Sequence, residues 1–184
     1  MKLWLVRHAR PMIAPGVCYG VTDMLADAQA TQASAMALAE VLPAGLSVYF
    51  SLLQRCEHLS QYLKGLRPDL TLIPDARLVE MDFGSWEGVR WNDINKAAID
   101  EWTADFFYFR FGGKESVFEL MQRVRQVLQE TSQTHTEAVW ITHAGVIRAV
   151  NLLAQGQFEL TSAMQWPKEV TDFGQWRALE VLQT

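Results

Sequence analysis

The sequence lacks the features of several large classes of protein. Of its 184 residues only Cys18 and Cys56 are cysteine, too few for a disulfide framework or for a zinc site built from four cysteines. No run of about 18 apolar residues occurs, and the apolar run at the N-terminus is short and stops at Arg7, which argues against a membrane span and a signal peptide. We therefore expect a cytoplasmic protein that does not act at a membrane.

An excess of positive charge is also missing. Sixteen Lys and Arg residues stand against 21 Asp and Glu residues, which gives a net charge of −5. Proteins that bind nucleic acid usually carry a basic excess, so we expect no nucleic-acid partner. Apolar residues make up 49% of the chain and charged residues 20%, as in ordinary globular proteins, and the length fits one domain over residues 1–184.

Short apolar runs alternate with amphipathic stretches along the chain. This order is typical of α/β proteins with a mostly parallel sheet. We predict strands at about 3–6, 47–50, 71–73 and 138–142, and helices at about 27–42, 52–66, from 116 onward and 145–154. The expected fold is a single α/β domain with helices on both faces of the sheet. The segment 81–113 reads as irregular, and the last thirty residues as an edge strand with a surface segment.

Polar side chains that can bind a ligand or take part in catalysis stand where the predicted strands end. Arg7 and His8 follow the first strand directly, and His143 follows the strand at 138–142. Arg55 lies in the first turn of the helix after the second strand, and Glu80 follows the third. Because open α/β sheets bind ligands at the carboxyl ends of their strands, we expect these five residues to share one rim.

This set of side chains favours a phosphoryl ligand. Arginine guanidinium groups match the oxygens of a phosphoryl group, and the free amides of the helix after His143 also favour an anion. The sequence has neither a Walker-type phosphate loop nor an aspartate cluster for magnesium. We therefore expect no metal and no cofactor. A histidine nucleophile can break a P–O bond without them, because neutral imidazole attacks phosphorus and phosphohistidine hydrolyses readily.

Five segments resemble one known family. They are, in chain order, LVRHA at 5–9, S-x-x-x-R-C at 51–56, VEMDFGSWEG at 79–88, GKES at 113–116 and THAG at 142–145. Over residues 2–155 the chain resembles the histidine phosphatases of the phosphoglycerate mutase-like superfamily. The EMDFGSWEG stretch and the short length most resemble alpha-ribazole phosphatases, which act in assembly of the nucleotide loop of cobalamin. The segment with Arg10, Tyr19 and Gly20 shares this resemblance, so these three are candidate substrate-binding residues.

The resemblance implies a role for each residue of the rim. His8 matches the phosphorylated nucleophile, and Glu80 matches the acid that protonates the leaving oxygen and then activates water. Arg7, Arg55 and His143 match the other residues of the phosphate pocket. The implied activity is metal-independent hydrolysis of a phosphomonoester through phosphohistidine. Such a nucleophile needs one free ring nitrogen, with the other held by a backbone carbonyl that fixes the tautomer. His143 adds a further donor if the charge of the approaching dianion favours its protonated form.

Two positions depart from the pattern of the family. Ala9 stands where a Gly usually follows the nucleophile, and Ala14 stands where an Asn is common six residues after it. The second change removes one contact to the phosphate, which Arg10 or a backbone amide would have to supply. Asp82 lies close to Glu80, as does Glu87, and both are alternatives for the acid.

Two other functions use the same residues. A phosphoglycerate mutase-type phosphotransferase would use all five rim residues. The mutases of this family tend to carry extra segments that keep water out of the site, so the short length of this chain argues against a mutase. A protein that binds a phosphorylated ligand without turnover is permitted by Ala9 and Ala14. In each case the partner is a small phosphorylated metabolite. Tyr19 and the aromatic residues at 102–111 suit a monophosphate that carries a ring. The sequence does not give the oligomeric state, although homodimers are common in the family.

Overall fold

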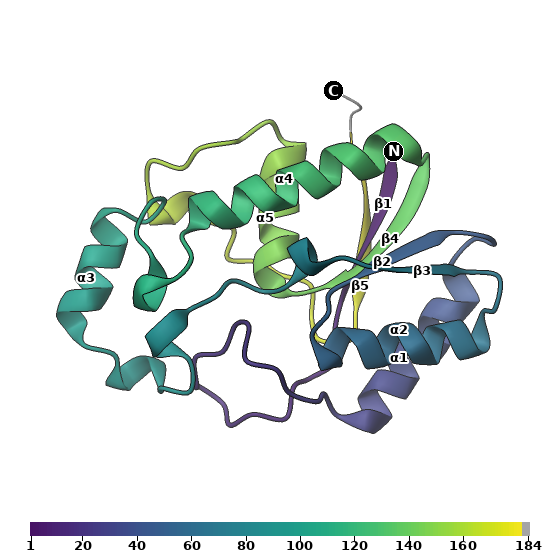
Figure 1. Cartoon of the computed structure of the whole chain (residues 1–184), viewed down its shortest axis with the longest axis horizontal. Helices are drawn as coiled ribbons and strands as arrows, with labels where there is room; N and C mark the ends of the chain where they lie inside the picture. The colour runs from purple at the N-terminus through teal and green to yellow at the C-terminus, as the bar shows by residue number, and fades with distance from the viewer. Residues whose placement is uncertain (182–184) are drawn as a thin grey trace.

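A five-stranded sheet with helices on both faces forms the centre of the computed structural model, which describes residues 1–181 (Figure 1). The strand order is β3-β2-β4-β1-β5. Four strands are parallel: β1 (Lys2–Arg7), β2 (Ser47–Phe50), β3 (Thr71–Pro74) and β4 (Glu137–Thr142). The edge strand β5 (Trp176–Glu180) pairs antiparallel with β1. The predicted α/β fold with a mostly parallel sheet is confirmed.

The side chains of the central strands alternate between two hydrophobic cores. Leu3, Leu5 and Trp140 face one core, and Val6 and Ile141 face the other. Helices α4 (Val117–Thr134) and α5 (Ala144–Ala154) supply the first core, and α1 (Ala28–Val41) and α2 (Gln54–Leu66) the second (Figure 1). All five of these strand side chains are fully buried. This explains the continuous apolar runs in the sequence, because a sheet covered on both faces has no polar side.

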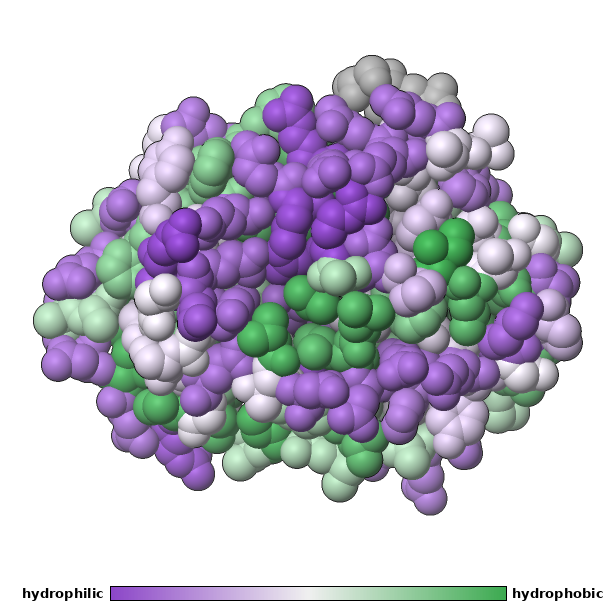
Figure 2. Space-filling model, viewed as in Figure 1, coloured by the Kyte–Doolittle hydropathy of each residue, from purple (hydrophilic) through white to green (hydrophobic). Residues whose placement is uncertain are grey.

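Helix α4 shows how the amphipathic pattern positions an element. Its buried residues, among them Leu120, Val124 and Val127, recur at the spacing of one helical face. Its outer face is polar, and Figure 2 shows a mainly hydrophilic surface over this helix, with the hydrophobic residues gathered nearer the middle of the view. None of the helices within residues 1–181 combines the length and the apolar character that crossing a bilayer requires.

Side-chain caps set the first residue of two helices. Asp27 accepts a hydrogen bond from the Ala30 amide at the start of α1. Ser116 and Glu119 form the predicted capping box at the start of α4, in which each side chain accepts from the backbone amide of the other. The helix predicted from residue 52 begins at Gln54 instead. Residue 52 is half exposed and lies outside α2.

The segment predicted to be irregular contains a further helix, α3 (Lys96–Ala104). None of its residues is fully buried, and its apolar side is short, with Ala98, Ile99 and Trp102 packed against the core. Short 3-10 helices flank it at η1 (Ala76–Leu78), η2 (Gly84–Trp86), η3 (Trp91–Asp93) and η4 (Phe111–Gly113), and η5 (Ala163–Gln165) follows later. The predicted edge strand near the C-terminus is confirmed as β5.

The capping box of α4 predicts a measurable loss of stability. We expect Ser116→Ala to lower the free energy of unfolding by about 1 kcal/mol, because the Glu119 amide loses its partner. For a chain of this length the melting temperature should fall by roughly 2–4 °C. Ser162→Ala is the matched control, since Ser162 caps only the exposed 3-10 helix η5 in the same way. Equal thermal shifts for the two variants would contradict the assignment.

Candidate active site

Three residues predicted to share one rim lie together at the carboxyl edge of the sheet. His8 follows β1, His143 follows β4, and Arg55 lies in the first turn of α2. The two imidazole rings have their centroids 5.0 Å apart. All three side chains are buried, with exposed fractions of 2% or less. Residues separated by 135 positions in the chain therefore form one cluster inside the protein.

His8 is held as a neutral ring with one free nitrogen. Its Nδ1 lies 2.7 Å from the carbonyl oxygen of Ala9. A carbonyl only accepts, so Nδ1 carries the hydrogen and Nε2 keeps its lone pair. Burial, followed by the charge of Arg55, lowers the pKa of His8 to about 3. The expected backbone contact that fixes the tautomer is thus present, and the ring is unprotonated at neutral pH.

His143 is also neutral and is tied to a serine that the sequence analysis gave no role. Its Nε2 lies 2.7 Å from Ser51 Oγ and 3.5 Å from Cys56 Sγ. Burial and then the charge of Arg55 keep the pKa of His143 well below its usual value. Ser51 belongs to the motif at 51–56, so the sequence marked it as a candidate. The sequence did not show that its hydroxyl contacts His143.

Arg55 is a buried cation bonded to main-chain carbonyls. Its Nη2 donates to Gly20 O at 2.6 Å and its Nη1 to Thr22 O at 2.9 Å. Glu87 holds this loop by accepting from the Thr22 amide. A Cβ on Gly20 would collide with the carbonyl oxygen of Met81, so only glycine allows this approach. Gly20 therefore lies behind the guanidinium group and supports it.

Arg7 is fixed by the C-terminal segment. Its guanidinium carbon lies 3.7 Å from the ring centroid of Phe173, and its Nη1 donates to Thr171 O at 3.0 Å. The same ring lies 5.6 Å from that of His8. The amide of Gly174 donates to the carbonyls of Arg7 and His8. The segment expected to lie on the surface thus reaches the site, and no periodic pattern in its sequence indicates this.

Tyr19 and Arg10, both candidate substrate contacts, are placed differently. Tyr19 is partly buried, with the Arg55 guanidinium carbon 5.7 Å from its ring centroid. Its hydroxyl interacts with Arg7, and burial raises the pKa of Tyr19. Arg10 is exposed, and its side chain makes no hydrogen bond or ion pair within residues 1–181. Ala14 is exposed as well. Tyr19 therefore belongs to the cluster, whereas Arg10 does not contact it.

Glu80 lies at the start of helix α5, beside the cluster. Its Oε2 accepts from the Gly145 amide at 3.1 Å, and its Oε1 from the Met81 amide at 3.0 Å. A Cβ on Gly145 would displace Oε1 of Glu80, so the glycine leaves room for the carboxylate in this position. Arg123 fixes the preceding backbone by donating to the carbonyls of Val79 and Glu80 at 2.7 and 3.1 Å.

The two alternative acids have other partners. Asp82 accepts from the Gly84 amide at 2.8 Å. Glu87 accepts from the backbone amides of Val21, Thr22 and Phe83. Of these three carboxylates, Glu80 is the one that lines the cavity described next.

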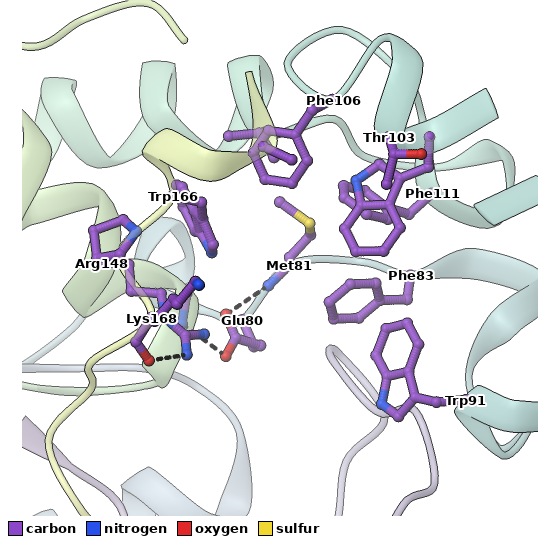
Figure 3. A pocket seen from close by; sticks show the side chains of 15 residues that line it. Glu80, Met81, Phe83, Trp91, Thr103, Phe106, Phe111, Arg148, Trp166 and Lys168 are labelled. Atoms are coloured by element: carbon purple, nitrogen blue, oxygen red, sulfur yellow. Dashed lines mark hydrogen bonds between the residues drawn. The ribbon is translucent and has the colours of Figure 1, made fainter. Parts of the chain in front are cut away.

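A cavity of about 480 Å³ opens beside Glu80 (Figure 3). Its size is that of ordinary small-molecule sites. Six aromatic residues line it: Phe83, Trp91, Trp102, Phe106, Phe111 and Trp166. Arg148 and Lys168 line the side nearest Glu80, as Figure 3 shows. The C-terminal segment thus supplies part of this wall as well.

The charges of the cluster suit an anion. Arg7 and Arg55 make no ion pair with a carboxylate in the described part of the chain. The Nε donors of both are buried without a hydrogen-bond partner. An unpaired buried donor is costly, and a ligand oxygen can satisfy it. Among residues 1–181 no group of three His, Cys, Asp or Glu side chains could hold a metal ion.

Comparison with known proteins finds several relatives and structural neighbours that are named as phosphatases. A protein of Hydrogenobacter thermophilus provisionally named phosphoserine phosphatase 2 is 28% identical over 161 residues, which are 84% of this chain and 79% of that protein. A mycobacterial glucosyl-3-phosphoglycerate phosphatase superposes with a TM-score of 0.81 at 21% identity, over 96% of this chain and 88% of that chain. A structure from Escherichia coli K-12, provisionally titled an alpha-ribazole-5'-P phosphatase, gives a TM-score of 0.80 at 22% identity, over 97% and 89%.

These two structures share the fold of this chain. The family is shown by a sequence model, that of the histidine phosphatase superfamily (branch 1), which matches residues 3–171. The match begins in β1, spans both histidines of the cluster, and ends at Thr171, beside Arg7. The chain therefore belongs to the histidine phosphatase superfamily (branch 1).

Proposed function

We propose that this histidine phosphatase hydrolyses phosphomonoesters through a phosphohistidine at His8, without a metal ion. One observation carries the proposal. A neutral His8 with a free Nε2 lies 5.0 Å from His143, ring centroid to ring centroid, beside two guanidinium groups that have no carboxylate partner. This arrangement combines a nucleophile with the positive charge that a phosphoryl group requires.

In the first step, Nε2 of His8 attacks phosphorus and the bond to the leaving oxygen breaks. Arg7 and Arg55 stabilise the charge on the phosphoryl oxygens, and a bound dianion offsets the repulsion that keeps His143 neutral. Glu80, in its protonated form, gives its proton to the leaving oxygen. The alcohol departs, and phosphohistidine and the Glu80 carboxylate remain.

In the second step, the Glu80 carboxylate accepts a proton from a water molecule as that water attacks phosphorus. The N–P bond breaks, inorganic phosphate forms, and neutral His8 returns with its hydrogen still on Nδ1. Glu80 is protonated again and ready for the next cycle. Arg123 and Gly145 support this role because they fix the backbone and the carboxylate of Glu80.

The cavity beside Glu80 supports a substrate whose leaving group carries a planar ring. Its aromatic walls offer faces against which such a ring can stack. Alpha-ribazole 5'-phosphate is one compound of this class, and both the EMDFGSWEG stretch and the similarity to the E. coli structure support it as the candidate substrate. A panel of phosphomonoesters scored by kcat/KM tests this choice.

Replacing the nucleophile tests the covalent step. We expect His8→Ala to abolish turnover of an aryl phosphate, because the variant lacks the Nε2 atom that forms the bond to phosphorus. Rapid quenching of the wild-type protein should trap a phosphoprotein that is labile to acid and stable to base, and the variant should trap none. His58→Ala is the control and should retain the label. Full activity in His8→Ala would rule out the scheme.

Replacing the acid should affect substrates unequally. We expect Glu80→Gln to slow hydrolysis of an alkyl phosphate by roughly 10²–10⁴-fold, since a poor leaving group depends on protonation. The loss should be much smaller for 4-nitrophenyl phosphate, whose leaving group needs little help. Asp82→Asn is the matched control and should stay close to wild type on both. Equal losses on the two substrates would argue against Glu80 as the acid.

Removal of divalent metals tests whether the protein alone supplies the positive charge that the phosphoryl group needs. Because Arg7 and Arg55 supply the positive charge, we expect steady-state activity to be unchanged after treatment with a chelator and after addition of magnesium. Loss of activity with the chelator that magnesium restores would contradict a metal-independent site.

A further inference from the structure

Ser51 carries a buried hydroxyl beside the cluster, with no part in the chemical steps at His8 and Glu80. It follows β2 directly, and its amide donates to the carbonyl of Ile141 in β4 at 3.0 Å. Ser51 and His143 are both fully buried, and Ser51 Oγ lies 2.7 Å from Nε2 of His143. The end of one strand therefore places a hydroxyl against the imidazole at the end of its neighbour.

The partners of this hydroxyl determine the direction of its hydrogen bond. Ser51 Oγ accepts from the Leu53 amide at 3.3 Å, and an amide N–H can only donate. The hydroxyl hydrogen therefore needs an acceptor, and Nε2 of His143 is placed to be one. The thiol of Cys56, 3.5 Å from the same nitrogen, donates to the carbonyl of Thr142 at 3.6 Å. Because a buried hydroxyl without an acceptor is costly, Ser51 donates and Nε2 accepts.

The direction of this bond fixes the tautomer of His143. A neutral imidazole carries one hydrogen, and the nitrogen that accepts a hydrogen bond does not carry it. The hydrogen of His143 is therefore on Nδ1, which lies 4.0 Å from Cys56 Sγ. Since Ser51 occupies Nε2, the ring can reach a phosphoryl oxygen through Nδ1. The two histidines then share one tautomer and use opposite atoms of it, because His8 presents the free Nε2 and His143 presents Nδ1–H.

We propose that Ser51 is a positioning residue that holds His143 as the Nδ1–H tautomer, so that a neutral His143 donates a hydrogen bond to the bound phosphoryl group. This inference rests on the proposed function and adds how His143 takes part in it. The donor is present before the ligand arrives, so His143 needs no proton from solution. Burial and the charge of Arg55 lower the pKa of His143, and in this tautomer the ring donates nevertheless. The protonated donor expected from the sequence is then unnecessary.

NMR reads the tautomer directly. In protein labelled with nitrogen-15 at histidine, couplings between the ring protons and the ring nitrogens distinguish Nδ1–H from Nε2–H, and His143→Gln assigns the signals of His143. We expect the Nδ1–H pattern in the wild type at neutral pH. Saturating inorganic phosphate should shift the Nδ1 signal and keep the pattern. An Nε2–H pattern, an unmoved Nδ1 signal, or hydrogens on both nitrogens with phosphate bound would overturn the proposal.

Replacing the hydroxyl should release the tautomer. In Ser51→Ala we expect the Nδ1–H pattern of His143 to give way to a mixture of tautomers, while His8 keeps its own pattern. Loss of this hydrogen bond should lower kcat/KM for 4-nitrophenyl phosphate roughly 10-fold. Ser60→Ala is the matched control and should change neither, since Ser60 is also fully buried but donates to the Glu57 carbonyl of its own helix. An unaltered His143 pattern in Ser51→Ala would overturn the proposal.

Two substitutions of the ring test which nitrogen meets the phosphoryl group. The side-chain amide of asparagine can take the place of Nδ1, and that of glutamine the place of Nε2. We expect His143→Asn to retain several-fold more kcat/KM than His143→Gln. Adding Ser51→Ala to His143→Asn should cost no further activity, because Ser51 acts through the ring. Equal or greater activity in His143→Gln, or a full further loss in the double variant, would overturn the proposal.

The outcome for this inference is separate from that for the proposed function. The NMR pattern needs no turnover, and the wild type and the His143 variants decide the question even where Ser51→Ala fails to fold. An active wild type whose His143 shows the Nε2–H pattern would contradict this inference and leave the phosphatase intact. A wild type that hydrolyses no phosphomonoester would instead contradict the proposed function.

Discussion

The guanidinium group of Arg55 is buried in the protein without a carboxylate beside it, and much of the site follows from that constraint. Main-chain carbonyls of the 20–22 loop solvate the cation, so the loop passes close to it, and Gly20 lets the same loop pack against the carbonyl of Met81. Glu87 in turn holds the loop in place. Burial and then this same charge keep both histidines neutral, because a protonated ring would be a second cation in a site that water does not reach. A dianionic phosphoryl group relieves the imbalance.

The fold supplies this arrangement from widely separated segments. Parallel strands β1, β2 and β4 end at one edge, so His8, Ser51 and His143 meet although the chain separates them. The C-terminal segment closes the site from the other side, with Phe173 on Arg7 and Trp166 in the cavity wall. The polar cluster around His8 and His143 and the aromatic cavity therefore lie next to each other, with Glu80 at their boundary.

The sequence predicted the parts of the site that obey strand-end placement. Arg7, His8 and His143 follow apolar runs directly, so their meeting could be read from the pattern. The choice of Glu80 as the acid needed the family resemblance, because Asp82 and Glu87 follow the same strand and were equally available. Phe173 could not be foreseen: its contact with Arg7 spans over 160 residues, and no period marks its segment. Helix α3 was missed for a related reason, since it buries no residue fully and its apolar face is limited to Ala98, Ile99 and Trp102.

The central claim is that Nε2 of His8 is the atom that meets phosphorus, between Arg7 and Arg55. Vanadate adopts the five-coordinate geometry of the phosphoryl group in transfer, so a crystal structure with vanadate tests the claim directly. The account predicts vanadium bonded to Nε2 of His8, its oxygens on both guanidinium groups, and the Nδ1 contact to the Ala9 carbonyl intact. Vanadate bound away from His8, or a His8 ring turned so that Nδ1 faces the metal, would contradict it.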